Sequence, residues 1–445
     1  MARPAELSRI TDPTVEPEVV ETPIIKSKPT SRRLGGLVGK GAAIALAIST
    51  LAGCNESGTA PTIRPIILSE PTPVVTQIPG KESPTPSGAE LLSPSSDTTP
   101  SGSPDAVTSP PPSPTETLSP REKLLTPHLM DVAAKSGMKV GVELTGGQLN
   151  NTEWSQTAAE QFNLATIDWG FNWSEVEPTR GNFDFSIADN QIAFAQSNNM
   201  EIRGQALVFP GATADWIANG KFSKSELTSI LVNHIKTVVG HYKGVVKEWV
   251  IVNEPYIDPY RPNDIFYKTI GPNYIDMAFK AAREADPSAK LIYNDSGNES
   301  SDPTNNNGLT TQLTRETVQR LKSEGLVDMV GVQMHLDADN PPNKQDVINT
   351  LKSYGLPVAI TEFDVNLQKI SGTKTQRYNL QAQIASNMVS ACRQSGVCKE
   401  FSFWGIGDNT SWLEVSLKEP NADPTLFDDS LNPKPEYFAV RKALS

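Results

Sequence analysis

Histidine and cysteine are scarce in this sequence, which contains four histidines and three cysteines in 445 residues. Cys392 and Cys398 enclose five residues, and two thiols without a neighbouring histidine are too few ligands for a metal site. We therefore expect no metal and no cofactor. If the protein is exported, a disulfide is the expected state of this pair.

Positive charge and long apolar runs are also lacking. The 39 lysines and arginines are outnumbered by 51 aspartates and glutamates, and the resulting net charge of −12 argues against nucleic acid or an anionic membrane surface as a partner. The apolar run near the N-terminus covers residues 41–53 and is short and rich in Gly and Ala for a stable membrane span. The composition fits an acidic enzyme or a surface protein better.

This apolar run nevertheless has the features of an export signal. Arg32, Arg33 and Lys40 precede it, and small residues close it. Residues 51–54 at its end, Leu-Ala-Gly-Cys54, resemble the bacterial lipobox, in which the cysteine receives lipid and becomes the mature N-terminus. We predict a leader at 1–53, lipidation of Cys54 and a lipid-anchored protein at the cell surface; an uncleaved anchor and plain secretion are the alternatives.

Proline is abundant, with 36 residues, and much of it lies between residues 55 and 120 in stretches such as SPPPSPTETLSP. A segment of this composition cannot bury enough apolar area to offset the entropy lost on ordering. The sequence therefore predicts a disordered linker at 54–125 that holds a folded domain, 126–445, away from a surface. The membrane would be contacted only through the lipid anchor.

The domain alternates short β-rich runs with stretches of helical periodicity, such as residues 223–242. The runs number eight, and eight β/α units with near-continuous apolar strands predict a (β/α)8 TIM barrel. A doubly wound open sheet is the alternative, and the lack of a Gly-rich phosphate loop after the first strand argues against it. The predicted strands are Met138–Leu144, Leu164–Trp169, Glu201–Phe209, Val246–Asn253, Ala289–Asp295, Met329–Leu336, Pro357–Val365 and Glu400–Ile406.

Polar residues gather at the C-terminal ends of these strands, where the active sites of such barrels lie. A barrel needs none of them for packing, so several together predict a site. They are Asp168, Gln205, Asn253, Glu254, Asn294, Asp295, Gln333, His335, Glu362 and Asp364, with Trp404 at the end of the last strand.

Two of these residues are glutamates that would face each other across the barrel mouth, Glu254 after strand four and Glu362 after strand seven. Two carboxyl groups across a pocket are the groups that glycosidic hydrolysis needs, one as acid and one as nucleophile or base. Asp364 would point to the same side as Glu362 and hold a neighbouring side chain. His335 would bond to Glu362 or else be a buried structural residue.

Aromatic residues near the same strand ends support a carbohydrate cleft. Sugar rings stack on flat indoles through their apolar faces, while their hydroxyl groups need amides and carboxylates. The indoles are Trp169, Trp404 and Trp412, and they alternate with amides such as Asn172 and Gln205.

Several motifs in this order resemble the endo-β-1,4-xylanases of glycoside hydrolase family 10. They are WVIVNE, VGVQMHL, ITEFDV, FSFWGIGDNTSW and LFDDSLNPKPEYFAV, and the resemblance covers about 160–440. It implies that Glu254 is the acid/base, that Glu362 is the nucleophile and that configuration is retained. It also implies that Asn253 holds the 2-hydroxyl of the attacked sugar, that Gln333 and His335 surround Glu362, and that Trp404 and Trp412 line the cleft.

The chain departs from the family pattern on the glycone side, which holds the sugars on the non-reducing side of the cleaved bond. Asp168, Trp169 and Asn172 stand where the family usually has Glu, Asn and Lys, and Gln205 stands where it usually has His. The departures predict an altered choice of sugar with catalysis retained.

We therefore expect a monomeric, exported, retaining endo-glycosidase whose partner is a plant polysaccharide, with xylan as first choice. A hydrolase of the same clan acting on β-glucan or another hemicellulose is one alternative. A catalytically inactive surface carbohydrate-binding protein is the other.

Overall fold

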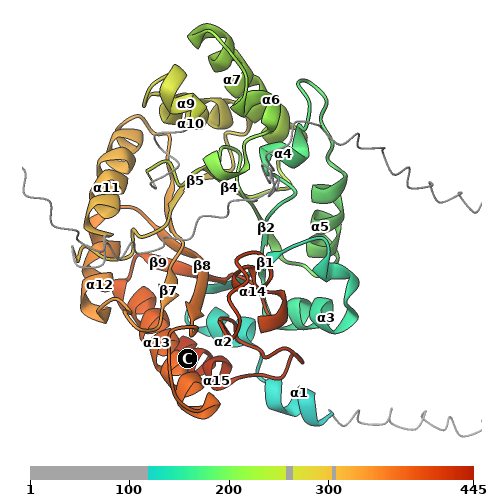
Figure 1. The fold of residues 1–445 in the computed structure, drawn as a ribbon, viewed down its shortest axis with the longest axis vertical. Coiled ribbons are helices and arrows are strands. Elements are labelled where there is room, and N and C mark those ends of the chain that lie inside the picture. The colour runs from blue at the N-terminus through green and yellow to red at the C-terminus, as the bar shows by residue number, and fades with distance from the viewer. Residues whose placement is uncertain (1–118, 257–263, 303–306) are drawn as a thin grey trace, which may run out of the picture. The chain divides into compact units, whose positions relative to one another are not determined.

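A computed structural model describes residues 119–256, 264–302 and 307–445, and these residues form a closed barrel of parallel strands. Strands β1 to β6 pair in sequence order, β6 pairs with β8, β8 with β9, and β9 returns to β1. Eight strands close the barrel, which confirms the predicted (β/α)8 architecture. Figure 1 shows the helices arranged around the strands.

The strand bounds follow the apolar runs of the sequence closely. The strands are β1 Lys139–Leu144, β2 Leu164–Ile167, β3 Glu201–Gly204, β4 Glu248–Asn253, β5 Lys290–Asp295, β6 Met329–Val332, β7 His335–Asp337, β8 Val358–Asn366 and β9 Cys398–Phe403.

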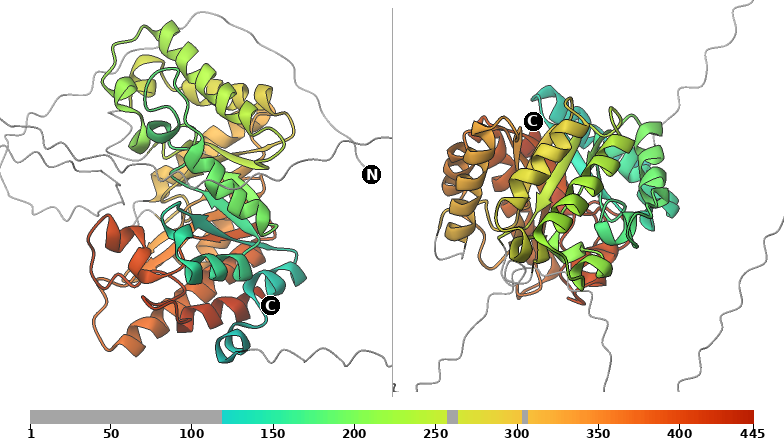
Figure 2. Two further views of the ribbon diagram at one scale, coloured as in Figure 1. Left: turned by 90° about the vertical axis from the view of Figure 1, so that its right-hand side faces the viewer. Right: turned by 90° about the horizontal axis from the view of Figure 1, so that it is seen from above.

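The helices carry their buried residues on the faces that cover these strands, and α7 packs along α10 (Figure 2). The α-helices are α1 Pro120–Leu125, α2 Leu129–Lys135, α3 Thr152–Gln161, α4 Trp173–Val176, α5 Ser186–Ser197, α6 Asp215–Ala218, α7 Lys224–His241, α9 Ile265–Thr269, α10 Tyr274–Ala285, α11 Asn307–Ser323, α12 Lys344–Ser353, α13 Lys374–Ser395, α14 Trp412–Val415 and α15 Pro435–Leu444. The short 3-10 turns are η1 Gln148–Asn150, η2 Pro210–Ala212 and η4 Asp408–Thr410.

Four predicted strands end earlier than expected. β3 ends at Gly204 instead of Phe209, and β9 ends at Phe403 instead of Ile406. In the other two, a residue at the C-terminal end of the predicted strand turns into the left-handed region. Trp169 has a φ of 64° and Met334 a φ of 66°. The first turn ends β2 at Ile167. The second divides the predicted sixth strand into β6, which belongs to the barrel, and the short β7, which pairs only with β8.

The ends of the described chain are tied together on the outside of the barrel. Residues 120–125, inside the range assigned to the linker, form α1, whose Leu125 carbonyl accepts a hydrogen bond from Tyr437 of α15 at 3.0 Å. The predicted disulfide is confirmed between Cys392 and Cys398. The predicted leader, Cys54 and the linker up to residue 118 lie outside the described residues. No helix in the described ranges is long and apolar enough to cross a membrane.

A buried ionic cluster fills the N-terminal end of the barrel interior. Arg203 of β3 is fully buried and bonds both Glu248 of β4 and Glu400 of β9, so it reaches across the barrel. Lys139 and Lys290 contact the same two carboxylates. Above this cluster lies an apolar layer of side chains, which are Ala206, Val250, Ile292, Met329 and Ala359. The polar mouth lies beyond that layer.

Candidate active site

The two predicted carboxyl groups come from opposite sides of the barrel mouth. Glu254 directly follows Asn253, the last residue of β4, and Glu362 lies within β8. Glu254 takes a left-handed φ of 53°, and its main-chain N–H donates to Asn294 at 3.1 Å. A strained backbone of this kind persists where surrounding contacts hold it, most often at functional sites.

Glu254 is a buried carboxyl group with an unusual affinity for its proton. Burial raises its pKa to about 8; the hydrogen bond from Gln333 opposes this shift, and the negative charge of Glu362 adds to it. Gln333 Nε2 donates to Glu254 Oε1 at 2.8 Å, while Glu254 Oε2 is buried without a hydrogen-bond partner among the described residues. The group can therefore hold a proton at neutral pH and offer it to a substrate.

Glu362 has the opposite surroundings, because three N–H groups face it. Gln205 Nε2 and Asn294 Nδ2 both donate to Glu362 Oε1 at 2.7 Å, and His335 Nε2 lies 3.2 Å from Oε2. Asn294 also donates to Asn253 Oδ1 at 2.8 Å, so it links the two halves of the site. Sequence reasoning noted Asn294 as a strand end but assigned it no role.

His335 is held by two acids. Its Nδ1 lies 2.8 Å from Asp364 Oδ2, and the same oxygen accepts a hydrogen bond from Trp412 Nε1 at 2.7 Å. Burial alone would lower the pKa of His335, but the Asp364 and Glu362 carboxylates raise it to about 10. Asp364 thus binds neighbouring side chains, as predicted. The His335 ring packs against Trp404 and Trp412 at centroid distances of 6.1 and 5.0 Å.

Three further predicted residues have contacts that the sequence did not specify. Gln333 bonds Glu254 through its side chain and meets Glu362 only through its main-chain oxygen, because the chain turns at Met334. Gln205, predicted to bind substrate, donates from its Nε2 to Glu362 Oε1. Asn172 is buried at the start of α4, and no hydrogen bond in the described ranges joins its side chain to the other predicted residues.

One acidic residue of the mouth was missed altogether. A Cβ atom added to Gly141 of β1 would lie against Ser402 Oγ, which accepts a hydrogen bond from Arg203 inside the barrel. Residue 141 therefore faces the barrel interior. Because side chains alternate along a strand, Glu143 lies on the same inner face, nearer the mouth. Burial and the charges of Asp168 and Glu362 raise its pKa well above the usual value. Period-two alternation from Gly141 is the signal that could have identified it.

Asp168 is the neighbouring acid, and its pKa is raised to about 7 by burial, with Glu362 adding to the shift. Across the residues the structure describes, no group of three or more His, Cys, Asp or Glu side chains is arranged to hold a metal ion.

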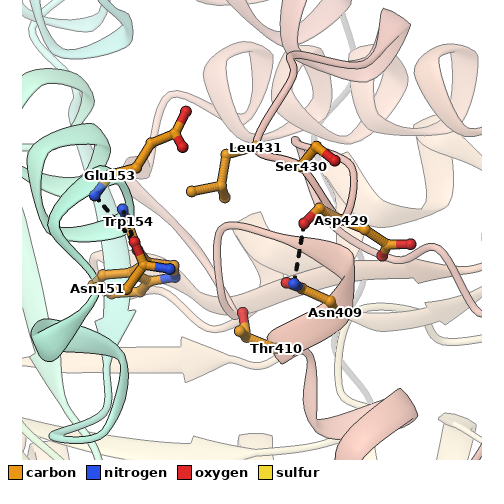
Figure 3. A pocket seen from close by; sticks show the side chains of 8 residues that line it. All are labelled: Asn151, Glu153, Trp154, Asn409, Thr410, Asp429, Ser430 and Leu431. Atoms are coloured by element: carbon orange, nitrogen blue, oxygen red, sulfur yellow. Dashed lines mark hydrogen bonds between the residues drawn. The ribbon is translucent and has the colours of Figure 1, made fainter.

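A separate hollow of about 310 Å³ lies between the start of α3 and the segments around residues 409–410 and 429–431 (Figure 3). Asn409, one of the amides near the predicted carbohydrate cleft, lines it, but neither Glu254 nor Glu362 does. Its polar groups serve the local chain: Asn151 accepts from the main chain of α3, and Asn409 donates to the Asp429 main-chain oxygen at 3.0 Å. The cavity is thus distinct from the pair of carboxyl groups, and we assign it no chemistry.

A parallel (β/α)8 barrel with two buried carboxyl groups across its mouth defines a glycoside hydrolase, an enzyme that cleaves O-glycosyl bonds. Comparison with known proteins identifies the group within this class. Residues 128–443 match Glycosyl hydrolase family 10, and the chain belongs to this family.

Individual relatives agree with this assignment. The chain is 33% identical over 297 residues to Endo-1,4-beta-xylanase B of Thermotoga neapolitana, covering 66% of this chain and 83% of that protein. The crystal structure of native xylanase 10B from Thermotoga maritima matches with a TM-score of 0.66 and 33% identity, over 71% of this chain and 98% of that one. Xylanase 10B from Thermotoga petrophila RKU-1, solved in complex with xylobiose, matches with a TM-score of 0.65 and 34% identity, over 71% and 97%.

Proposed function

We propose that this chain is a retaining endo-β-1,4-xylanase in which Glu254 is the acid/base and Glu362 the nucleophile. One observation carries the proposal: two buried carboxyl groups share one hydrogen-bonded network at the barrel mouth, where burial raises the pKa of Glu254 to about 8 while Glu362 accepts hydrogen bonds from Gln205 and Asn294 and lies 3.2 Å from His335 Nε2. Of two carboxyl groups in one site, the one whose surroundings favour the protonated form acts as the acid, and the one whose surroundings favour the ionised form acts as the nucleophile. The similarity to xylanases supports xylan as the substrate.

In the first step, Glu254 gives its proton to the glycosidic oxygen as that bond breaks, and a Glu362 oxygen bonds the anomeric carbon. In the second step, Glu254 takes a proton from water, and the water oxygen displaces Glu362 from the same carbon. Two attacks from opposite sides retain the configuration. Asn253 Oδ1 already accepts from Asn294 and Gln333, and its Nδ2 makes one long hydrogen bond of 3.5 Å to Glu254 Oε1. The second N–H of Nδ2 is therefore the group that would donate to the 2-hydroxyl of the sugar.

A second candidate substrate is β-glucan or another hemicellulose. The observation that favours it is the altered glycone side, where Asp168 and Trp169 precede α4 and Gln205 is occupied by Glu362. An inactive sugar-binding protein is disfavoured, because binding alone needs neither the protonated Glu254 nor the three N–H groups around Glu362.

A panel of xylan, mixed-linkage glucan, xyloglucan and mannan separates these candidates. We expect reducing ends to be released fastest from xylan, with internal cleavage that lowers its viscosity early. The products should keep the β configuration when they are first formed, which nuclear magnetic resonance of the anomeric proton measures. A faster reaction on a glucan would move the substrate to the second candidate, and binding without hydrolysis on every polymer would contradict the enzyme.

We further propose that the protein is exported and anchored through Cys54, with the Pro-rich segment as its spacer. The basic residues, the apolar run and Leu-Ala-Gly-Cys54 support this proposal. The full chain, expressed in a bacterium and labelled with radioactive glycerol, should carry label in the membrane fraction. Cys54→Ser should lose the label and Cys392→Ser, which changes a cysteine of the barrel, should keep it. Label retained in Cys54→Ser would rule out the anchor.

A further inference from the structure

A buried ion pair joins the loop that follows β9 to the C-terminal segment, residues 423–434. Lys434 and Asp408 are 2% and 1% exposed, and Lys434 Nζ lies 3.0 Å from each oxygen of the Asp408 carboxylate. The same nitrogen donates to the Asp423 main-chain oxygen at 2.7 Å and lies 4.6 Å from the centre of the Tyr378 ring. Because an ammonium group has three N–H donors, these three bonds use all of them.

Net stability does not explain this pair, because a buried ion pair replaced by apolar side chains often leaves a protein as stable or more stable. Burial raises the pKa of Asp408 to about 6, and Lys434 opposes that shift. A further buried acid, Glu436 at the start of α15, also faces Lys434. Burial raises the pKa of Glu436 to about 8, so this group is neutral at neutral pH and leaves Lys434 to Asp408.

Asp408 is connected to Trp412 by a short and well-bonded stretch of chain. Asp408 begins η4, and its main-chain oxygen accepts from the Ser411 N–H at 3.1 Å. Ser411 caps α14, whose first residue is Trp412. On its other side, Asp408 Oδ1 accepts from both the N–H and the hydroxyl of Thr425 at 2.9 Å. The position of Trp412 therefore depends on how firmly Asp408 is held to the C-terminal segment.

From Trp412 a chain of hydrogen bonds leads to the proposed nucleophile. Trp412 Nε1 donates to Asp364 Oδ2 at 2.7 Å. The same oxygen lies 2.8 Å from His335 Nδ1, and His335 Nε2 lies 3.2 Å from Glu362 Oε2. A misplacement of about 1 Å that starts far from the reacting atoms can lower a rate about a hundredfold. A displaced Trp412 would release one of the two groups that hold Asp364, and His335 would lose its fixed direction.

We propose that Lys434 and Asp408 are positioning residues for Glu362. Their ion pair fixes the loop after β9 to the C-terminal segment, and this keeps the indole N–H of Trp412 at the head of the hydrogen-bonded chain that ends on the nucleophile. Since every N–H group of Lys434 is used within the protein, its effect on the reaction passes through other side chains. The inference rests on the proposed hydrolysis of β-1,4-xylan.

Removing both charges together tests this role, because removing one would leave the other buried without its partner. In Lys434→Met/Asp408→Asn, called the charge-free variant, asparagine keeps an oxygen for the two bonds from Thr425. The Asp423 oxygen keeps its bond from Gln381 Nε2 at 2.6 Å. The charge-free variant should therefore unfold within about 4 °C of the wild type, measured by calorimetry.

Activity is measured on a dinitrophenyl xylobioside, whose leaving group needs no proton from Glu254, so that kcat/KM reports the attack by Glu362. The charge-free variant should lower kcat/KM about tenfold or more. Lys236→Met is the matched control, because Lys236 of α7 pairs with Glu284 of α10 at 2.7 Å and is half-exposed. The control should stay within about twofold of the wild type.

A double-mutant cycle with Trp412→Phe shows whether the loss passes through the indole N–H. Phenylalanine keeps an aromatic ring but cannot donate to Asp364, so Trp412→Phe alone should lose at least as much as the charge-free variant. Combined with Trp412→Phe, the charge-free variant should lower kcat/KM by less than about threefold more. A further full loss of about tenfold would overturn the positioning role, because general loosening of the fold acts with or without that N–H.

Asp408→Asn alone is a second and smaller change that keeps the size of the side chain. It should show a loss in the same direction and the same dependence on Trp412. A charge-free variant that keeps kcat/KM within about threefold of an active wild type would contradict only the positioning role. A wild type that cleaves neither the xylobioside nor xylan would contradict the proposed function itself.

Discussion

Glu362→Ala is expected to lower kcat/KM on xylan by at least about 10⁴-fold, because it removes the atom that bonds the anomeric carbon. Glu362→Gln should lose as much while it preserves the volume and polarity of the side chain. The contacts of Glu362 support this role, because Gln205, Asn294 and His335 all direct N–H groups at its carboxylate and so favour the ionised form that a nucleophile needs. Initial rates of reducing-end release measure it, and thermal unfolding establishes that the variants fold.

Azide makes the test specific to a nucleophile. In Glu362→Ala the removed side chain leaves room for azide to attack the anomeric carbon from that side. Azide then takes the position of the covalent intermediate, so the product should be an α-glycosyl azide, which nuclear magnetic resonance identifies. Turnover of xylan within tenfold of the wild type, or a β-glycosyl azide from this variant, would show that Glu362 is not the nucleophile.

Glu254→Gln is expected to lower kcat on xylan by about 10³-fold or more, because the sugar leaving group then departs without a proton. A dinitrophenyl xylobioside has a leaving group that needs no protonation. Bond cleavage on this substrate should therefore lose less than about tenfold, measured as the burst of dinitrophenolate. Azide should now yield a β-glycosyl azide from Glu254→Ala, since it replaces the water of the second step. Equal losses on both substrates would contradict the acid role.

The pH profile supplies a second check on Glu254. Its pKa is raised to about 8 by burial, so the side chain carries its proton below pH 8 and loses it above. The rate on xylan should accordingly be sustained through neutral pH and fall about tenfold per pH unit above 8. With the dinitrophenyl substrate, the fall above pH 8 should be absent for bond cleavage in Glu254→Gln. An alkaline fall that survives in that variant would belong to another group.

The barrel could be predicted because its strands are short apolar runs with polar ends, and parallel strands bring those ends to one mouth. Glu254, Glu362, His335 and Asp364 were found in this way, and the structure brings them into one network. The sequence pattern does not encode the backbone φ angles of single residues at strand ends. The left-handed turns at Trp169 and Met334 depend on tertiary contacts, so β2 and the sixth predicted strand were drawn too long.

The same limit explains which hydrogen-bond partners could not be assigned from the sequence. An amide such as Gln205 reaches a sugar or a carboxylate with equal ease, and only the fold places it 2.7 Å from Glu362. Asn294 could be recognised as a strand end. Its hydrogen bond from β5 to Glu362 of β8 could not be predicted, because the sequence does not give the distance between these two strands. Glu143 was overlooked because one acid within an apolar run has no local signal except its two-residue spacing from Gly141.

The ionic cluster around Arg203 bears on how the chain reaches its native state. Its members lie on strands from the beginning, middle and end of the domain, at residues 139, 203, 248, 290 and 400. A growing chain that has not yet reached residue 400 leaves Arg203 with one of its two carboxylates, and a half-paired buried charge is costly. The barrel can therefore close stably only after β9, the last strand, has been synthesised. Fragments that stop before β9 should be open to proteases, and synthesis of the domain ends in a cooperative step.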